Sequence, residues 1–235
     1  MLKKKHPEKP SAVIFDLDGT LVDSALDLTA TLNHLLRVNG RQTIGHDVVR
    51  HMVGEGARAL IIKGFSHTGD LPSEDKIDEI FEEYLSYYLA NVSVETVMFE
   101  GVSDVLNKLQ AQSIPMAVCT NKITELTHAL LKSLKIDHFF SAVTCGDSFD
   151  YKKPDPRHLL STCDMMGIDP TAAVMVGDSA SDVNSAIAAN IPVIGVSFGY
   201  TAIPMAELGP SIVIDHFDEF MEALNVVRRR TAEET

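Results

Sequence analysis

The segment Phe15-Asp16-Leu17-Asp18-Gly19-Thr20 constrains the fold and chemistry of this chain more than any other part of it. It follows the apolar run Ala12–Phe15, which is typical of a strand buried in a parallel sheet. Because Asp16 and Asp18 stand two residues apart, their carboxylates can converge on one point beyond the strand end. Carboxylates held that close repel each other unless a cation or a proton compensates them. The segment therefore predicts a divalent metal site with a proton-transfer carboxylate. The alternative is a solvated Asp-Gly turn.

The length and composition indicate an ordinary globular protein. The 235 residues suffice for one domain or for a domain with an insertion, and 45% of them are hydrophobic. A net charge of −13 argues against partners such as nucleic acid or anionic membranes. It still permits an anionic small substrate, because a metal ion and one lysine can reverse the local field.

Three further observations bear on the compartment and the chain ends. No apolar stretch approaches the length of a membrane span, and Cys119, Cys145 and Cys163 are typical of reduced buried thiols, so we expect a cytoplasmic protein. Residues 1–10 are basic without a following apolar signal segment, and residues 226–235 include three consecutive arginines. We expect both ends to be flexible tails. A monomer and a homodimer are both compatible with this sequence.

One helical block interrupts an alternation of strand and helix patterns. Residues 23–92 show apolar spacing typical of helices and no strand pattern. From Gly101 onward, apolar strand-like runs alternate with amphipathic helical stretches. This rhythm predicts an α/β fold with a doubly wound parallel sheet, built from residues 11–22 and 93–225. Residues 23–92 would form a helical domain inserted after the first strand.

Polar residues also follow the later strands, at the edge where doubly wound folds bind ligands. Thr120 and Asn121 follow an apolar run and can hold phosphoryl oxygens at a helix start, although simple capping of that helix is the alternative. Lys153, fixed by the next proline, can supply a point charge to a phosphate or lie in a solvated turn. Asp178 and Asp182 lie four residues apart at another helix start, where they can serve as an inner and an outer partner of a hard cation. For Asp182, a plain helix-start role is the alternative.

Taken in order, these motifs resemble the haloacid dehalogenase superfamily of phosphotransferases, from Ala12 to about Ala223. The motifs that carry the resemblance are Asp16-x-Asp18-Gly19-Thr20, Thr120-Asn121, Lys153-Pro154 and Gly177-Asp178-x-x-x-Asp182. The helical block matches the cap domain that these enzymes insert after the first motif. Within it, the segment from Gly54 to Arg58 resembles phosphoglycolate phosphatases. Glu100 stands where such enzymes usually carry proline, near the hinge back into the core.

The resemblance implies that Asp16 is a nucleophile that forms an aspartyl-phosphate, and that Asp18 is the general acid and base. It implies that Thr120, Asn121 and Lys153 bind the phosphoryl oxygens.

The implied cofactor is Mg²⁺, held by Asp16, Asp178 and the backbone carbonyl of Asp18, with Asp182 supporting the water shell. In the cap, Gly54 and Arg58 are expected to face the substrate, Arg58 by binding a small carboxylate. The alternative for Arg58 is a solvated arginine or one paired with Glu55.

The function that the resemblance favours is hydrolysis of a small phosphorylated metabolite, 2-phosphoglycolate above all. A sugar-phosphate mutase or a broad-range sugar phosphatase of the same superfamily is the enzymatic alternative. An inactive binding or regulatory protein with this fold is the alternative of another class.

Overall fold

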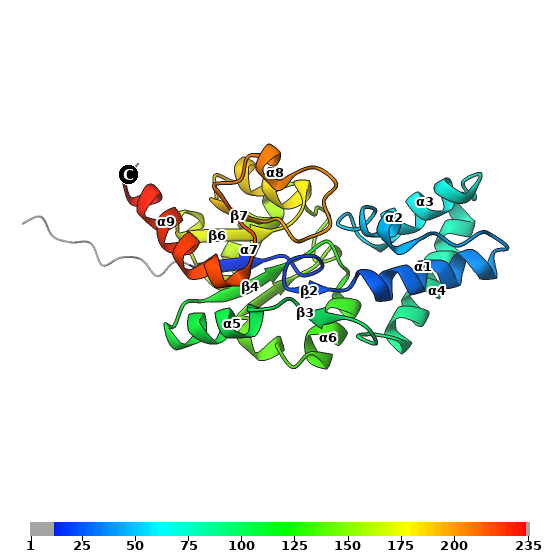
Figure 1. Cartoon of the computed structure of the whole chain (residues 1–235), viewed down its shortest axis with the longest axis horizontal. Helices are drawn as coiled ribbons and strands as arrows, with labels where there is room; N and C mark the ends of the chain where they lie inside the picture. The colour runs from blue at the N-terminus through cyan, green and yellow to red at the C-terminus, as the bar shows by residue number, and fades with distance from the viewer. Residues whose placement is uncertain (1–11, 234–235) are drawn as a thin grey trace, which may run out of the picture.

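The computed structural model describes residues 12–233, so the tail expected at residues 1–10 lies outside the described residues. Six parallel strands form its main sheet, in the order β5-β4-β1-β6-β7-β8 (Figure 1). These strands are β1 (Ala12–Phe15), β4 (Met116–Cys119), β5 (Ala142–Thr144), β6 (Ala173–Gly177), β7 (Val193–Val196) and β8 (Ile212–Ile214). The predicted doubly wound parallel sheet is confirmed. Its order places β1 and β6, which carry the two acid motifs, side by side at the centre.

Helices cover both faces of the sheet, which explains why β1, β4 and β7 are apolar and buried along their whole length. Helices α5 (Val102–Ala111), α6 (Thr124–Ser133) and α9 (Phe220–Glu233) pack on one face. Helices α7 (Pro156–Met166) and α8 (Ala180–Ala188) pack on the other. Among the described residues there are also short 3-10 helices at Asp137–Phe139, Pro170–Ala172, Met205–Leu208 and Phe217–Glu219.

The C-terminal segment corrects one prediction. Helix α9 spans Phe220–Glu233, so residues 226–233 are helical and do not belong to a tail. The Phe220 ring stacks on Phe15 of the central strand, with ring centroids 5.8 Å apart, and Val227 one turn beyond Leu224 is buried. Burial of one apolar face on the sheet stabilises this helix although its sequence contains three consecutive arginines.

The block expected to be helical contains α1 (Ala25–Val38), α2 (His46–Arg50), α3 (Ala57–Thr68) and α4 (Glu74–Ala90). These helices form a separate lobe at the end of the molecule opposite α9 (Figure 1). The lobe has its own apolar cluster, to which Leu32, Phe65 and Tyr84 contribute. We call α1–α4 the helical lobe.

Two short strands join the lobe to the sheet domain. They are β2 (Val22–Asp23) and β3 (Val97–Met98), which pair in antiparallel fashion. Sequence analysis did not predict this pair, because two residues are too few to show a strand pattern.

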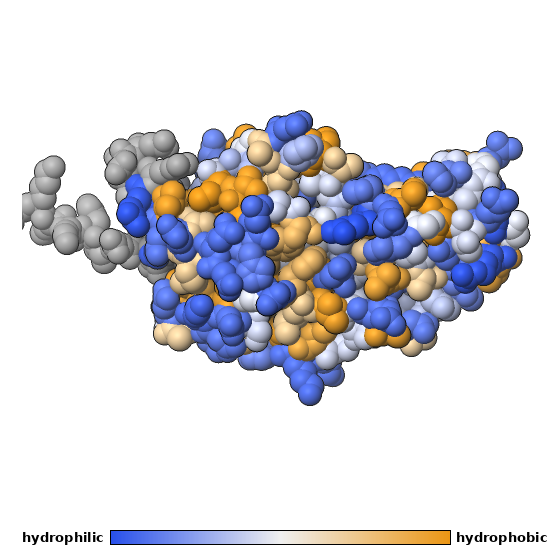
Figure 2. Space-filling view, in the orientation of Figure 1, coloured by the Kyte–Doolittle hydropathy of each residue, from blue (hydrophilic) through white to orange (hydrophobic). Residues whose placement is uncertain are grey.

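On the surface view, polar and charged residues cover much of both lobes, with apolar residues in separate groups between them (Figure 2). Within residues 12–233, no helix has the length and apolar character needed to cross a bilayer.

Candidate active site

Three buried aspartates meet at the carboxyl ends of the two central strands. Asp16 directly follows β1, Asp178 directly follows β6, and Asp182 lies in the first turn of α8. One carboxylate oxygen from each lies within 4.8 Å of the others. Burial, reinforced by Asp182, raises the pKa of Asp16 to about 6 although Lys153 opposes the shift. Burial and the two neighbouring acids raise the pKa of Asp178 well above its usual value. The cluster thus holds more negative charge than its surroundings compensate.

Lys153 is the cation inside this cluster. Its Nζ lies 2.9 Å from Oδ1 of Asp16 and 2.6 Å from Oδ1 of Asp182, and it donates a hydrogen bond to the carbonyl of Cys119. Burial disfavours the charged form of Lys153, but Asp16 and Asp182 outweigh that effect and raise its pKa. The lysine is therefore charged and held beside Asp16, where the motif resemblance expected it.

Both oxygens of Asp182 already have partners in the protein. Oδ1 pairs with Lys153, while Oδ2 accepts hydrogen bonds from the backbone N–H and the hydroxyl of Ser179. Ser179 and Asp182 form a capping box that starts α8. Asp182 therefore has the helix-start role that the sequence offered as an alternative. Its carboxylate also lies within reach of the other two, and its role beside a cation remains a prediction.

Asp178 is held by hydrogen bonds from distant parts of the chain. Oδ2 accepts from the backbone N–H of Tyr200 at 2.7 Å, and Oδ1 accepts from the hydroxyl of Thr20 at 3.1 Å. Gly19, with φ +87°, packs directly against this carboxylate. A Cβ at Gly19 would overlap Asp178, which explains in steric terms why the first motif has glycine at this position.

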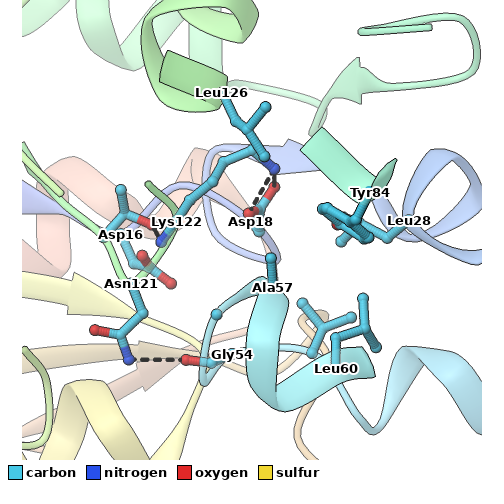
Figure 3. Close-up of a pocket in the computed structure, with 13 residues that line it drawn as sticks. Asp16, Asp18, Leu28, Gly54, Ala57, Leu60, Tyr84, Asn121, Lys122 and Leu126 are labelled. Carbon is cyan, nitrogen blue, oxygen red and sulfur yellow. Dashed lines mark hydrogen bonds and ion pairs between the residues drawn. The ribbon is translucent and has the colours of Figure 1, made fainter. Parts of the chain in front are cut away.

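The Asp18 side chain does not join the three aspartates. Its carboxylate faces Lys122 of the loop after β4, with Nζ 3.0 Å from Oδ2 and 3.2 Å from Oδ1 (Figure 3). The Ser24 hydroxyl also donates to Oδ1 of Asp18. A metal contact through the backbone carbonyl of Asp18 remains a prediction. The Asp18 carboxylate does not lie in the aspartate cluster, so it is available for proton transfer.

Lys122 is the site residue that sequence analysis missed. Its side chain is only 4% exposed, and its Nζ lies 4.4 Å from the centre of the Tyr88 ring. Burial disfavours its charge, but Asp18 and Tyr88 raise its pKa above the usual value. The one signal in the sequence is that Lys122 directly follows the Thr120-Asn121 motif.

The two predicted phosphate-binding residues after β4 lie at the site in different ways. Thr120 lines the pocket, and its hydroxyl accepts a hydrogen bond from the backbone N–H of Lys122 at 3.2 Å. Asn121 donates its amide to the carbonyls of Gly54, at 3.0 Å, and Lys153, at 2.9 Å. The side chain of Asn121 therefore ties the helical lobe to the sheet domain beside the cluster (Figure 3).

Of the two residues expected to face the substrate from the lobe, only Gly54 lines the pocket. The guanidinium of Arg58 pairs with Asp78 and, at 2.6 Å, with Glu74, both on α4. These hydrogen bonds raise the pKa of Arg58 at a solvated surface. The expected contact of Arg58 with the site is not present, and its partners are not the predicted Glu55.

The pocket has one charged and one apolar side. Asp16, Asp18, Thr120, Asn121 and Lys122 form the polar side. The helical lobe and the start of α6 contribute Leu28, Val53, Gly54, Gly56, Ala57, Leu60, Tyr84 and Leu126. Tyr84 and Leu60 appear across the pocket from Asp16 in Figure 3. Such a site suits a small ligand whose anionic end meets the sheet domain.

Residues 13–196 match the family of haloacid dehalogenase-like hydrolases. The chain belongs to this family. This hydrolase is 43% identical to the phosphoglycolate phosphatase of Agrobacterium fabrum over 220 residues, which are 93% of this chain and 94% of that protein. It is 40% identical to the phosphoglycolate phosphatase of Caulobacter vibrioides over 212 residues, 90% of each chain.

Solved structures agree. A predicted phosphoglycolate phosphatase from Haemophilus somnus 129pt matches this hydrolase with a TM-score of 0.87 and 30% identity, over 91% of this chain and 97% of that one. The predicted superfamily and the likeness to phosphoglycolate phosphatases are confirmed.

The residues of this hydrolase fit a hard divalent cation. Mg²⁺ prefers carboxylate oxygens, and here three buried carboxylates lie close together while Lys153 pairs with only two of them, Asp16 and Asp182. The raised pKa values of Asp16 and Asp178 show that their ionised forms lack compensation in the protein alone. A bound cation would remove that excess of negative charge.

Proposed function

We propose that this hydrolase is a Mg²⁺-dependent phosphatase that converts 2-phosphoglycolate to glycolate and phosphate through an aspartyl-phosphate. The observation that carries the proposal is the buried Asp16 carboxylate, held 2.9 Å from Lys153 and beside Asp178. The similarity to phosphoglycolate phosphatases over more than nine-tenths of the chain supports the choice of substrate.

Asp16 acts as the nucleophile. One of its oxygens forms a bond to phosphorus while the bond from phosphorus to the ester oxygen breaks. Lys153 and Thr120 bind oxygens of the transferred phosphoryl group, since Lys153 pairs with Asp16 and Thr120 lines the same pocket as Asp16.

Asp18 moves the protons. It gives a proton to the departing ester oxygen, and it then removes one from the water that attacks the aspartyl-phosphate. Asp18 lines the same pocket as Asp16, but its carboxylate faces Lys122 rather than the cluster, which supports a separate role for it.

Asp16 and Asp178 would hold Mg²⁺ by their carboxylates, with the Asp18 carbonyl as a further ligand. Asp182 orients Lys153 and supports the water shell of the ion. A bound Mg²⁺ supplies positive charge that keeps Asp16 ionised beside an anionic substrate. The binding of the ion would also offset the repulsion among the three aspartates.

We propose that residues 23–92 form a cap domain over a core of residues 11–22 and 93–225. The pocket lies between these parts, because Gly54 and Tyr84 come from the lobe and Asp16 from the sheet domain. The mostly apolar lobe side offers few partners to sugar hydroxyl groups, which disfavours a sugar-phosphate mutase or sugar phosphatase.

A panel of phosphate esters tests this function. We expect Mg²⁺-dependent phosphate release, with a higher kcat/KM for 2-phosphoglycolate than for glucose 6-phosphate, ethyl phosphate or p-nitrophenyl phosphate. Phosphorus NMR with glucose 1-phosphate would reveal a mutase by an isomerised product. A sugar phosphate as the best substrate, or no turnover of any ester, would refute the proposal.

A further inference from the structure

The pocket contains a cation that the proposed chemistry does not use. Among the described residues that line it, Lys122 is the one that carries a positive charge. Lys153, which serves the phosphoryl group, lies on the other side of Asp16 among the aspartates. A lysine that is only 4% exposed needs an anion, because an unpaired buried charge is strongly destabilising.

In the structure that anion is Asp18. Nζ of Lys122 lies 3.0 Å from Oδ2 and 3.2 Å from Oδ1 of Asp18, so the lysine contacts both carboxylate oxygens. The Tyr88 ring covers the lysine from the helical lobe. This arrangement leaves Asp18 facing Lys122, whereas the proposed acid must face the ester oxygen of the substrate.

Other cations near the pocket have partners of their own in the part of the chain that the structure describes. Lys152 donates to the carbonyl of Glu55 and does not line this pocket. Arg58 is held at the surface by Glu74 and Asp78. On the lobe side, the pocket walls near Lys122 are formed by Leu28, Leu60 and Tyr84. A carboxylate that enters this side of the pocket therefore has Lys122 as its charged partner among the lining residues described.

We propose that Lys122 is a specificity-determining residue that exchanges Asp18 for the carboxylate of the substrate. This inference rests on the proposed function. The exchange keeps the lysine paired. It frees Oδ2 of Asp18 for the ester oxygen, while Oδ1 keeps the hydrogen bond from the Ser24 hydroxyl. Recognition of the acid end of the substrate thus orients the proton donor, and a substrate without that end leaves Asp18 on the lysine.

The proposed exchange also implies a preferred chain length. In 2-phosphoglycolate a single methylene separates the ester oxygen from the carboxylate. Asp18 must touch the ester oxygen, and Lys122 lies within hydrogen-bond distance of Asp18. The lysine therefore meets a carboxylate placed one methylene away. One more methylene, as in 3-phosphonooxypropanoate, moves the carboxylate out of register with Lys122.

The test compares Lys122→Met with Lys132→Met, which removes the same charge from an exposed position of α6. The readout is the ratio of kcat/KM for 2-phosphoglycolate to kcat/KM for ethyl phosphate, which lacks the carboxylate. We expect Lys122→Met to lower this ratio at least about tenfold, the scale of one charge-assisted hydrogen bond. Lys132→Met should keep the wild-type ratio. A general loss of stability or activity lowers both rates and leaves the ratio unchanged.

The wild-type enzyme provides a second measurement that needs no folded variant. It should prefer 2-phosphoglycolate over 3-phosphonooxypropanoate by at least about tenfold. Equal rates on these two acids, or an unchanged ratio in a folded Lys122→Met, would overturn the inference while leaving the phosphatase function intact. Failure of the wild-type enzyme to hydrolyse 2-phosphoglycolate, with turnover of other esters, would instead refute the proposed function and the inference with it.

Discussion

The backbone N–H of Tyr200 donates a 2.7 Å hydrogen bond to Oδ2 of Asp178. The hydroxyl of the same tyrosine accepts hydrogen bonds from the backbone N–H groups of Ser24, at 2.7 Å, and Ala25, at 3.1 Å, where α1 begins. From the lobe, Arg50 donates to the carbonyl of Gly199. The loop after β7 therefore makes hydrogen bonds to three parts of the molecule. These are the proposed metal ligand Asp178, the start of α1, and Arg50 of the helical lobe.

Replacing Tyr200 by Phe should reduce stability with little effect on the metal site. The change removes the acceptor of the buried Ser24 N–H and leaves the Ala25 N–H only a 3.4 Å bond to Asp23, but it keeps the backbone bond to Asp178. Unsatisfied buried donors cost about 1–3 kcal/mol, so we expect the free energy of unfolding to fall by that amount. Urea denaturation checks the stability, and titration with Mg²⁺ checks the site. Unchanged stability would contradict the capping role of the hydroxyl.

Replacing Asp16 by Asn should abolish turnover in a folded protein. Asn keeps the shape but lacks the charge needed to attack phosphorus and to bind the metal. We expect activity below roughly one per cent of wild type, a loss of about 2.7 kcal/mol in barrier reduction. Exposed Asp164 gives a matched control, since Asp164→Asn makes the same chemical change on α7 and should keep full activity. Residual activity of Asp16→Asn above that threshold would rule out the nucleophile assignment.

The stabilising effect of Mg²⁺ should grow with pH. Burial raises the pKa of Asp16 from 3.8 to about 6, so the folded metal-free protein binds more protons than the unfolded chain between these values. The contribution of Asp16 to stability is therefore largest below pH 4 and is lost as the pH rises through about 6. Ionised Asp16 is the form that a cation stabilises.

Thermal melts of the EDTA-treated protein, with and without Mg²⁺, check this sign. We expect the increase in Tm on adding Mg²⁺ to be larger at about pH 7.5 than at about pH 5. In Asp16→Asn the increase should be smaller and should depend less on pH. An equal increase at both pH values in the wild type would contradict the coupling between Asp16 and the metal.

Replacing Asp18 by Asn should affect poor leaving groups most. The glycolate oxygen needs a proton as it departs, whereas p-nitrophenolate can leave without one. Rapid-mixing measurements of the first step should therefore show a much larger loss on 2-phosphoglycolate than on p-nitrophenyl phosphate. Similar losses on both esters would show that Asp18 is not the general acid.

Replacing Arg58 by Ala should change little. In the structure this arginine pairs with Glu74 and Asp78 at a solvated surface and does not line the pocket. Exposed ion pairs contribute little, so kcat/KM for 2-phosphoglycolate should stay within about threefold of wild type. A selective loss of kcat/KM on 2-phosphoglycolate, with p-nitrophenyl phosphate unaffected, would instead support the substrate-binding role that the sequence suggested for Arg58.

The sequence predicted the parallel sheet and the placement of both acid motifs at strand ends, and the strand order then showed that these two strands are the central pair. The predicted features are local: an apolar run of four or five residues marks a buried strand, and the residues that follow it lie at the sheet edge whatever the rest of the chain does. For the same reason Asp178 could be singled out without knowing its neighbours, whereas Lys153 was recognised by the proline that follows it and by the family motif. The two-residue strands β2 and β3 were not predicted, since they carry no pattern of their own.

Only the tertiary structure decided which partners the long side chains take. Lys122 meets Asp18 across 104 positions of sequence, and Tyr200 meets Asp178 through a loop that no motif marks. Arg58 pairs with Glu74 and Asp78 of α4, because α3 and α4 pack together and bring these two acids within its reach. The C-terminal arginines belong to a helix, because Phe220 and Leu224 of α9 pack against the sheet. Strands and motifs follow from residues adjacent in the chain, whereas the partner of a flexible charged side chain depends on how distant elements pack, and the sequence pattern does not contain that packing.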